Sequence, residues 1–418
     1  MARTVSPWLI FSIAFSAGVI ATLVQFSVPP VLPLLQARFA TPYAETGLLM
    51  SLFALATLLS AVPGGFVVQR YGVRTVGLVG LGTMFVGVLC CFLAPDFTGY
   101  LIGRVVCGVG FGFVSVAAPS TIGSFVPPDM MSMAMGIWST WVPFGSFVMF
   151  LVAPSLVVHG TFASLHLLLL SVLALDCIVY AVCIPPLPQT VERKSGGRLD
   201  ASPRDNSMWV RQLKQPMMWC VAGAFASFTF CFFAFNTWIS TYFVESSMSL
   251  TAAARIPLVA SLFTIMSNLY SGVLLKRVGN QLLLFLLPPL VMALMWPLFM
   301  LKVTVVSYGC AAIVGAVGGV LPTIVFAAAP RLALSKETMG MAMSIVIVGE
   351  NTGILVGPEL FGVMRGMTGH FVLPFWTLFA VGLFGVLFSL SIWRCRVFQL
   401  APPHKEALEA NLSNQLPH

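Results

Sequence analysis

Twelve apolar runs divide this chain, and each is long enough to cross the hydrocarbon core of a bilayer as a helix. Such a crossing takes roughly 17–25 predominantly apolar residues, and a helix satisfies its own backbone N–H and C=O groups, as lipid requires. Only 8% of the residues are charged, whereas a soluble domain typically carries about a quarter. The sequence therefore predicts an all-α integral membrane protein with twelve transmembrane helices. The expected spans are residues 8–32, 44–67, 75–94, 98–124, 131–156, 161–184, 216–244, 252–275, 281–301, 303–328, 338–366 and 370–393.

One long hydrophilic stretch, residues 185–215, separates six of these spans from the other six. It is rich in Pro, Gly, Ser and basic residues, a composition typical of a solvated linker, and we expect one short amphipathic helix within it. The chain is thus predicted to contain an N-terminal six-helix bundle (1–184), this linker, a C-terminal six-helix bundle (216–396) and a tail (397–418).

Lysine and arginine are distributed unequally between the two ends of the expected spans. If the N-terminus is cytoplasmic, sixteen of the 21 basic residues lie on the cytoplasmic side, four lie outside, and Arg104 lies within a span. The positive-inside rule then predicts a multi-pass protein of the plasma (inner) membrane with both termini in the cytoplasm. The net charge of +8 is spread over short loops beside anionic lipid, without the basic stripe of a nucleic-acid-binding protein.

Cysteine and histidine give no support to a metal site, a cofactor or a disulfide framework. Eight of the nine cysteines fall within expected spans, no C-x-x-C occurs, and the five histidines are isolated. The sequence also lacks the G-x-S-x-G, H-E-x-x-H and G-x-x-x-x-G-K-[ST] motifs of hydrolases, metalloproteases and ATP-driven pumps. We therefore expect no enzyme activity and no direct use of ATP.

Short patterns recur at a nearly constant shift of about half the chain. Residues 65–72 (GFVVQRYG) match residues 272–279 (GVLLKRVG) at a shift of 207, and residues 133–137 match residues 341–345 at a shift of 208. Two pairs of glycines also match at 207, namely Gly108 with Gly315 and Gly112 with Gly319. Three matches in register indicate a duplicated six-helix unit, so we expect two pseudo-symmetric bundles, an arrangement common among transporters.

The loop after the second expected span resembles a signature of the major facilitator superfamily. The segment G-F-V-V-Q-R-Y-G-V-R, from Gly65 to Arg74, is similar to that family's G-x-x-x-D-R-x-G-R-R/K, and residues 272–279 resemble its copy in the second half. The resemblance implies cytoplasmic gate loops in which glycines let helix ends approach closely. Where the family has an acidic residue, this chain has Gln69 and Lys276. The expected gate residues are Gly65, Gln69, Arg70, Gly72, Arg74, Gly272, Lys276, Arg277 and Gly279.

A second resemblance concerns the fourth span, where R-V-V-C-G-V-G from Arg104 is similar to the family pattern R-x-x-x-G-x-G. It implies a role for Arg104 in coupling or in positioning the helix, because an arginine within a span is costly. The alternative is an arginine that extends to water at the outer end of the helix.

In the family, the first, fourth, seventh and tenth helices line a central cavity, with the second, fifth, eighth and eleventh beside them. The expected solute-binding residues are the polar and aromatic ones on these helices: Gln25, Arg104, Trp138, Trp141, Asn236, Trp238, Asn268 and Asn351. For a lone Asn or Gln, the alternative is an interhelical hydrogen bond.

Three carboxylates fall within expected spans: Asp176 on the sixth helix, and Glu350 and Glu359 on the eleventh. Each is costly if it is ionised toward lipid, so each is a candidate for proton coupling. Glu350, near mid-span, is the preferred candidate, and Glu359 is expected to face the outer vestibule. The alternative for Glu350 is a permanently protonated carboxyl that donates an interhelical hydrogen bond.

These patterns together favour a secondary active transporter that moves a small organic solute by alternating access, coupled to protons by symport or antiport. Two alternatives remain, a multidrug or metabolite efflux antiporter and a non-transporting receptor or scaffold built on a transporter fold. The spans contain acids but no lysine, which favours a neutral or cationic solute, while Arg104 leaves an anion possible. Residues 236–245 resemble the cyanate and nitroimidazole branch of the family. The expected partners are the solute, protons and the lipid bilayer, with no nucleic acid, and the protein is expected to be a monomer.

Overall fold

The computed structural model describes residues 6–185, 206–278, 281–334 and 338–394 of the chain. In these residues, 12 helical segments are long and apolar enough to cross a membrane, which confirms the predicted number. The rest of the predicted linker (186–205), the tail and Gly279 lie outside the described residues. The described part of the linker contains the short helix α9.

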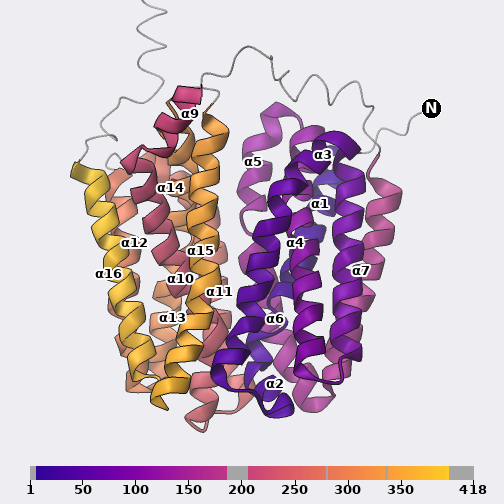
Figure 1. The fold of residues 1–418 in the computed structure, drawn as a ribbon, viewed down its shortest axis with the longest axis vertical. Helices are drawn as coiled ribbons and strands as arrows, with labels where there is room; N and C mark the ends of the chain where they lie inside the picture. The colour runs from indigo at the N-terminus through magenta and orange to yellow at the C-terminus, as the bar shows by residue number, and fades with distance from the viewer. Residues whose placement is uncertain (1–5, 186–205, 279–280, 335–337, 395–418) are drawn as a thin grey trace, which may run out of the picture.

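The two halves of the chain form two bundles that lie side by side (Figure 1). The N-terminal half contains α1 (Pro7–Gln25), η1 (Pro29–Val31), α2 (Leu32–Phe39), α3 (Tyr43–Leu93), α4 (Phe97–Phe125), α5 (Pro128–Trp138), α6 (Trp141–His159) and α7 (Phe162–Cys183). After α9 (Asn206–Leu213), the C-terminal half contains α10 (Pro216–Glu245), α11 (Leu250–Arg277), α12 (Gln281–Met295), η2 (Pro297–Leu301), α13 (Thr304–Gly318), α14 (Val320–Ala328), η3 (Ala329–Leu332), α15 (Met339–Thr368) and α16 (Val372–Arg394).

Four spans that the sequence predicts as single helices are broken in the structure. The first span breaks between α1 and α2, the fifth between α5 and α6, the ninth between α12 and η2, and the tenth between α13 and α14. Each break lies at a proline or within about one turn before it: Pro29, Pro143, Pro297 and Pro322. Proline lacks an N–H group, and its ring clashes with the carbonyl four residues earlier, so the helical ladder is interrupted there.

The predicted loop between the second and third spans is almost absent. The helix α3 contains both spans, and Gly72, with φ 84° and ψ 157°, is its one residue with non-helical backbone angles. Only glycine adopts this combination readily, because a Cβ would clash with the backbone. Gly72 therefore provides the reversal between the two spans.

Equivalent glycines make equivalent contacts in the two halves, so the sequence repeat is also a structural one. A Cβ on Gly108 would meet the Phe53 carbonyl, and a Cβ on Gly315 would meet the Ala260 carbonyl, with both partners shifted by 207. Gly112 at Ser60 repeats as Gly319 at Ser267, again with shifts of 207. Gly145 at Thr22 repeats as Gly353 at Thr229, with a shift of 208 for the glycine and 207 for the threonine. These contacts bring helices of one half together at backbone distance.

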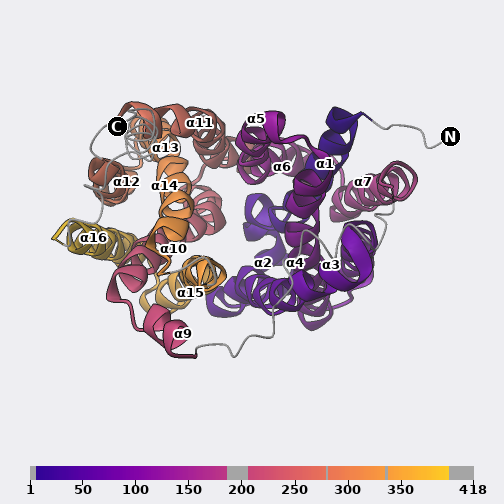
Figure 2. The same ribbon diagram turned by 90° about the horizontal axis from the view of Figure 1, so that it is seen from above.

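The two ends of the molecule differ. We call the end that carries α9 the linker end and the opposite end, which carries α2, the far end (Figure 1). Toward the far end the halves meet through α3 with α15 and α6 with α11, as the view from above also shows (Figure 2). At the linker end, a Cβ built on Gly65, Gly136 or Gly272 would meet no atom of another described element within 4 Å. The halves thus contact each other mainly toward the far end and lie further apart at the linker end (Figure 1).

Candidate functional site

Glu350 lies in the middle of α15, at a place where this helix packs tightly against α10. The neighbouring glycines allow this approach, because Gly349 packs against the Ala222 carbonyl and Gly353 against Thr229. The Thr229 hydroxyl donates to the Glu350 carbonyl oxygen over 2.9 Å. The Glu350 side chain is half-buried, and its carboxyl has no hydrogen-bond or ion-pair partner among the described residues.

The other two predicted carboxylates lie apart from Glu350. Glu359 is on the same helix but toward the far end, where its Oε2 is buried without a partner next to Gly47 of α3. Asp176 is on α7, inside the N-terminal half, with 4% of its surface exposed. Its Oδ1 accepts a hydrogen bond of 2.7 Å from the Ser16 hydroxyl, and its Oδ2 is buried without a partner. The structure therefore does not bring the three together.

Arg104 is buried within the N-terminal half, with 1% of its surface exposed. Its guanidinium donates to the carbonyl oxygens of Val24 at 2.7 Å, Gln25 at 3.1 Å and Leu49 at 3.3 Å. It also lies 4.5 Å from the centroid of the Phe53 ring. Arg104 thus joins α4 to the end of α1 and to the first part of α3, and its head does not extend to the surface.

Two of the predicted tryptophans belong to a row of rings that leads to Arg104. Trp138 and Trp141, on either side of the break between α5 and α6, stack with centroids 5.0 Å apart. Trp141 stacks on Phe111 at 5.6 Å, and Phe111 contacts Phe53 edge-on at 5.4 Å. Trp138 is buried and Trp141 is half-buried. The row connects the helix break in the fifth span with the arginine in the fourth.

Gln25 and Asn236 present open hydrogen-bond acceptors from the two halves. The Gln25 Oε1 and the Asn236 Oδ1 are buried without partners. Phe26 and Phe233, which are close to them in sequence, contact each other across the halves at 6.0 Å. Two hydroxyls on the next turn of α10 are also buried without partners, those of Ser240 and Thr241. An unsatisfied buried polar group costs about 1–3 kcal/mol, so these positions suit contacts with a polar solute.

The remaining polar candidates have partners in the protein. The Asn268 amide donates to the Ser139 carbonyl oxygen in the other half over 2.7 Å. The Trp238 indole N–H donates to the Pro358 carbonyl oxygen over 2.8 Å. Asn351 donates to a carbonyl oxygen of its own helix. In this state Asn268 and Trp238 each join two helices, and the Asn351 amide is bonded within α15.

The predicted gate residues lie at the linker end of α3 and α11, away from the polar groups described above. Arg74 donates to the Ala181 carbonyl oxygen over 2.5 Å, which ties α3 to the end of α7 within the same half. Arg70 lies over the ring of Tyr71 at 5.4 Å, and Arg277 is exposed. Gln69 and Lys276 are helical positions in α3 and α11.

The far end is closed by three residues that the sequence analysis did not propose as site residues. Glu245 accepts a hydrogen bond from the Tyr43 hydroxyl, 2.5 Å, and forms an ion pair with Arg365, 2.7 Å. The Arg365 guanidinium also lies 4.5 Å from the Tyr43 ring centroid. Tyr43 belongs to the N-terminal half and the other two to the C-terminal half, so we call this set the far-end latch. A sequence signal existed, because an acid and a base occur at the predicted outer ends of the seventh and eleventh spans.

Comparisons with known proteins agree with this architecture. Residues 14–358 match the sequence profile described as Major Facilitator Superfamily. The chain is 22% identical over 400 residues to the hexuronate transporter of Bacillus subtilis (strain 168), covering 91% of this chain and 92% of that protein. It is 24% identical over 243 residues to the probable anion transporter 6, chloroplastic, of Arabidopsis thaliana, covering 54% and 46% of the two chains. The crystal structure of a D-xylose-proton symporter superposes with a TM-score of 0.74 at 13% identity, over 92% of this chain and 97% of that chain.

Proposed function

Because the chain belongs to the Major Facilitator Superfamily, and is therefore a transporter of small solutes, we propose that it is a secondary active transporter that works by alternating access and is coupled to protons. The finding that carries the proposal is the difference between the two ends. The far end is closed between the halves by the latch, while the linker end is parted. A transporter caught in one of its two half-open states has this asymmetry.

The solute is proposed to contact groups that have no partner in this state. Gln25 on α1 and Asn236 on α10 offer buried acceptors from the two halves, and Trp141 offers a half-buried ring surface. A small polar organic molecule matches these groups, since hydroxyls would donate to the acceptors and an apolar face would pack on the ring. The names of relatives add hexuronate, other anions and xylose as solutes to test.

Glu350 is the proposed carrier of the coupling proton. Its carboxyl lacks a partner in the described residues, so protonation changes its charge without breaking an ion pair. The helix that carries it, α15, also crosses the interface at the far end, where Leu355 accepts a hydrogen bond from Ser51 of α3 over 2.7 Å. Protonation of Glu350 and movement of the two halves would therefore both involve the helix α15. The distribution of basic residues supports the proposal that the linker end faces the cytoplasm. The protein is proposed to be a monomer in a plasma (inner) membrane.

The test uses purified protein in liposomes. Counterflow of radiolabelled D-glucuronate, D-xylose and a neutral control sugar would identify exchange, and an imposed pH gradient would drive accumulation. We expect Glu350→Gln to exchange solute but not to accumulate it, because glutamine keeps the size and polarity of the side chain but cannot titrate.

Matched controls are Asp176→Asn and Glu359→Gln, which neutralise the other two intramembrane carboxylates. Both variants should still accumulate solute when Glu350 is the proton carrier. Accumulation by Glu350→Gln equal to that of the wild type would assign the proton to another group, and absence of exchange by the wild type with every solute would favour a scaffold.

A further inference from the structure

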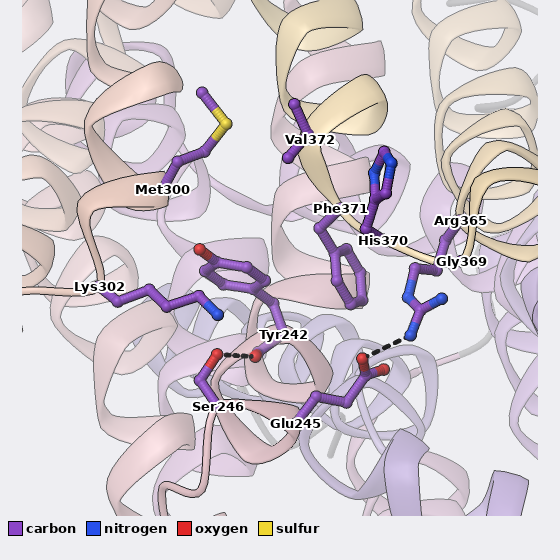
Figure 3. A pocket seen from close by; sticks show the side chains of 10 residues that line it. All are labelled: Tyr242, Glu245, Ser246, Met300, Lys302, Arg365, Gly369, His370, Phe371 and Val372. Carbon is purple, nitrogen blue, oxygen red and sulfur yellow. Dashed lines mark hydrogen bonds and ion pairs between the residues drawn. The ribbon is translucent and has the colours of Figure 1, made fainter.

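A cavity of about 220 Å³ opens at the far end of the C-terminal half, beside the latch (Figure 3). This volume is below the roughly 300–1,000 Å³ of pockets for drug-sized ligands, so the cavity suits a small molecule. Its lining comes from the ends of α10 and α15, from η2 and from the start of α16. The row of buried rings and the unpartnered acceptors described above belong to other parts of the molecule.

Basic groups outnumber acidic ones around this cavity. Lys302 and Arg365 line it together with His370, and Glu245 is the acid among its lining residues. Glu245 is already paired with Arg365. The Lys302 ammonium lies 5.5 Å from the centroid of the Tyr242 ring, and no acid lies within 4 Å of it in the described residues. A single negative charge would therefore neutralise the cavity.

Arg365, which lines the same cavity, has one guanidinium nitrogen without a partner. Its Nη2 is engaged by Glu245, but its Nε is buried and has no hydrogen-bond partner. The guanidinium lies 4.5 Å from the centroid of the Tyr43 ring and 5.0 Å from that of Phe371. A planar guanidinium pairs strongly with carboxylates, so Arg365 can exchange Glu245 for a carboxylate that enters the cavity.

The lining also contains aromatic surface. Tyr242 and Phe371 contact each other edge-on at 5.2 Å, and both line the cavity. Figure 3 shows these rings between Lys302 on one side and Arg365 on the other. Rings of this kind pack against the C–H faces of a sugar, and Ser246 adds a hydroxyl to the lining.

We propose that this cavity is a binding site for a small sugar acid or a similar organic carboxylate, and that its occupancy releases the far-end latch. The carboxylate pairs with Lys302 and competes with Glu245 for Arg365. Once Glu245 loses Arg365, its carboxylate keeps only the hydrogen bond from the Tyr43 hydroxyl of the other half. The site goes beyond the proposed central path, because it lies within the C-terminal half and does not depend on which solute crosses.

The test is hydrogen–deuterium exchange of the full chain in nanodiscs of neutral lipid, with D-glucuronate as the probe and D-glucose as the uncharged control. We expect glucuronate, but not glucose, to increase backbone exchange in residues 43–51 and 359–368 at least several-fold. Lys302→Gln should lose this response, and Lys302→Arg should keep it. The matched control is Lys214→Gln, an exposed lysine at the linker end, which should respond as the wild type does.

A response of Lys302→Gln equal to that of the wild type, or no response of the wild type at saturating glucuronate, would overturn the proposal. Nanodiscs that contain anionic lipid separate the two sources of negative charge. If anionic lipid alone produces the exchange increase and Lys302→Gln removes it, a headgroup occupies the cavity and the assignment of a soluble carboxylate is wrong. These outcomes are read from exchange, so they stand apart from counterflow, which tests the proposed function.

Discussion

Polar groups inside the membrane-spanning part divide into those whose hydrogen bonds are complete and those that are left open. Arg104 belongs to the first kind, since three backbone carbonyls accept from its guanidinium. Glu350, Gln25 and Asn236 belong to the second kind. A buried or half-buried group without a partner is costly, and under the proposed function a proton or a solute would complete these sites during transport.

Arg104→Lys is expected to lower both stability and transport. A lysine ammonium cannot reproduce the planar fork that reaches α1 and α3 at once, and each lost hydrogen bond from a charged donor costs about 1.5–3 kcal/mol. Thermal unfolding in one detergent and counterflow in liposomes measure the two effects. Arg255→Lys, at an exposed arginine of α11, is the control. A lysine variant with the wild-type melting temperature would show that the carbonyl contacts contribute little.

The sequence could name the unusual residues but not their surroundings. The rarity of charge within spans was enough to select Arg104, Asp176 and the two glutamates of α15. Most spans are apolar on every face, so no polar stripe tells which face of a helix is turned toward a neighbour. Whether Asn268 meets Ser139 in the other half or a solute depends on helix rotation, which only the packed structure defines.

For the helices, the length of each apolar run and the repeat between the two halves of the sequence predicted the structure correctly. Twelve spans, and the glycine contacts that recur at a shift of 207, follow from patterns that each helix carries by itself. The breaks at Pro143 and Pro322 were not predicted, because prolines such as Pro119 and Pro257 lie inside continuous helices. Neighbouring helices determine whether a proline bends a span or breaks it.

Gly72→Leu is expected to slow transport while solute affinity stays within several-fold. Its backbone angles are ones that a branched residue adopts only with strain of about 1–3 kcal/mol, and the strain acts at the reversal between two spans, far from the proposed solute contacts. Turnover in liposomes and equilibrium binding measure the two quantities. Gly82→Leu is the control, since Gly82 is a helical position of α3 with open space around it and is not among the predicted gate residues. Weak binding combined with an unchanged turnover rate would contradict the expectation.

At the scale of the whole molecule, contacts toward the far end hold the two halves together in this state. Opening the far end requires separation of Tyr43 from Glu245, of Ser51 from Leu355 and of the rings of Tyr43 and Trp238, 5.8 Å apart. Within each half, glycines such as Gly108 and Gly315 bring the helices together at backbone distance. The halves are therefore expected to move as rigid units while this interface breaks and forms again.

Tyr43→Phe should shift the population toward a far end that is open. The variant keeps the ring that lies against Arg365 and Trp238 but loses a hydrogen bond to a charged group, and such a loss of about 1.5–3 kcal/mol changes an equilibrium roughly tenfold or more. Electron–electron distances between spin labels at Leu93 and Val305, both exposed at the far end, report the change in a background without the native cysteines. The control is Tyr270→Phe, at an exposed tyrosine of α11, which should leave the spin-label distances unchanged. If Tyr43→Phe also leaves the distribution of these distances unchanged, the Tyr43 hydroxyl does not contribute to the latch.

The parted linker end makes the two faces of the protein unequal as targets. Consider an antibody fragment with a long rigid loop, raised against the surfaces of α3 and α15 near Gly65 and Met339. Because these surfaces are already apart in this state, the loop could insert between the two halves without a conformational change. At the far end the same loop could insert only after the hydrogen bond between Tyr43 and Glu245 has broken. Inhibition of transport by such a fragment should therefore be rapid from the linker side of the membrane and slow from the far side. The ratio of the two rates would measure how often the far end opens.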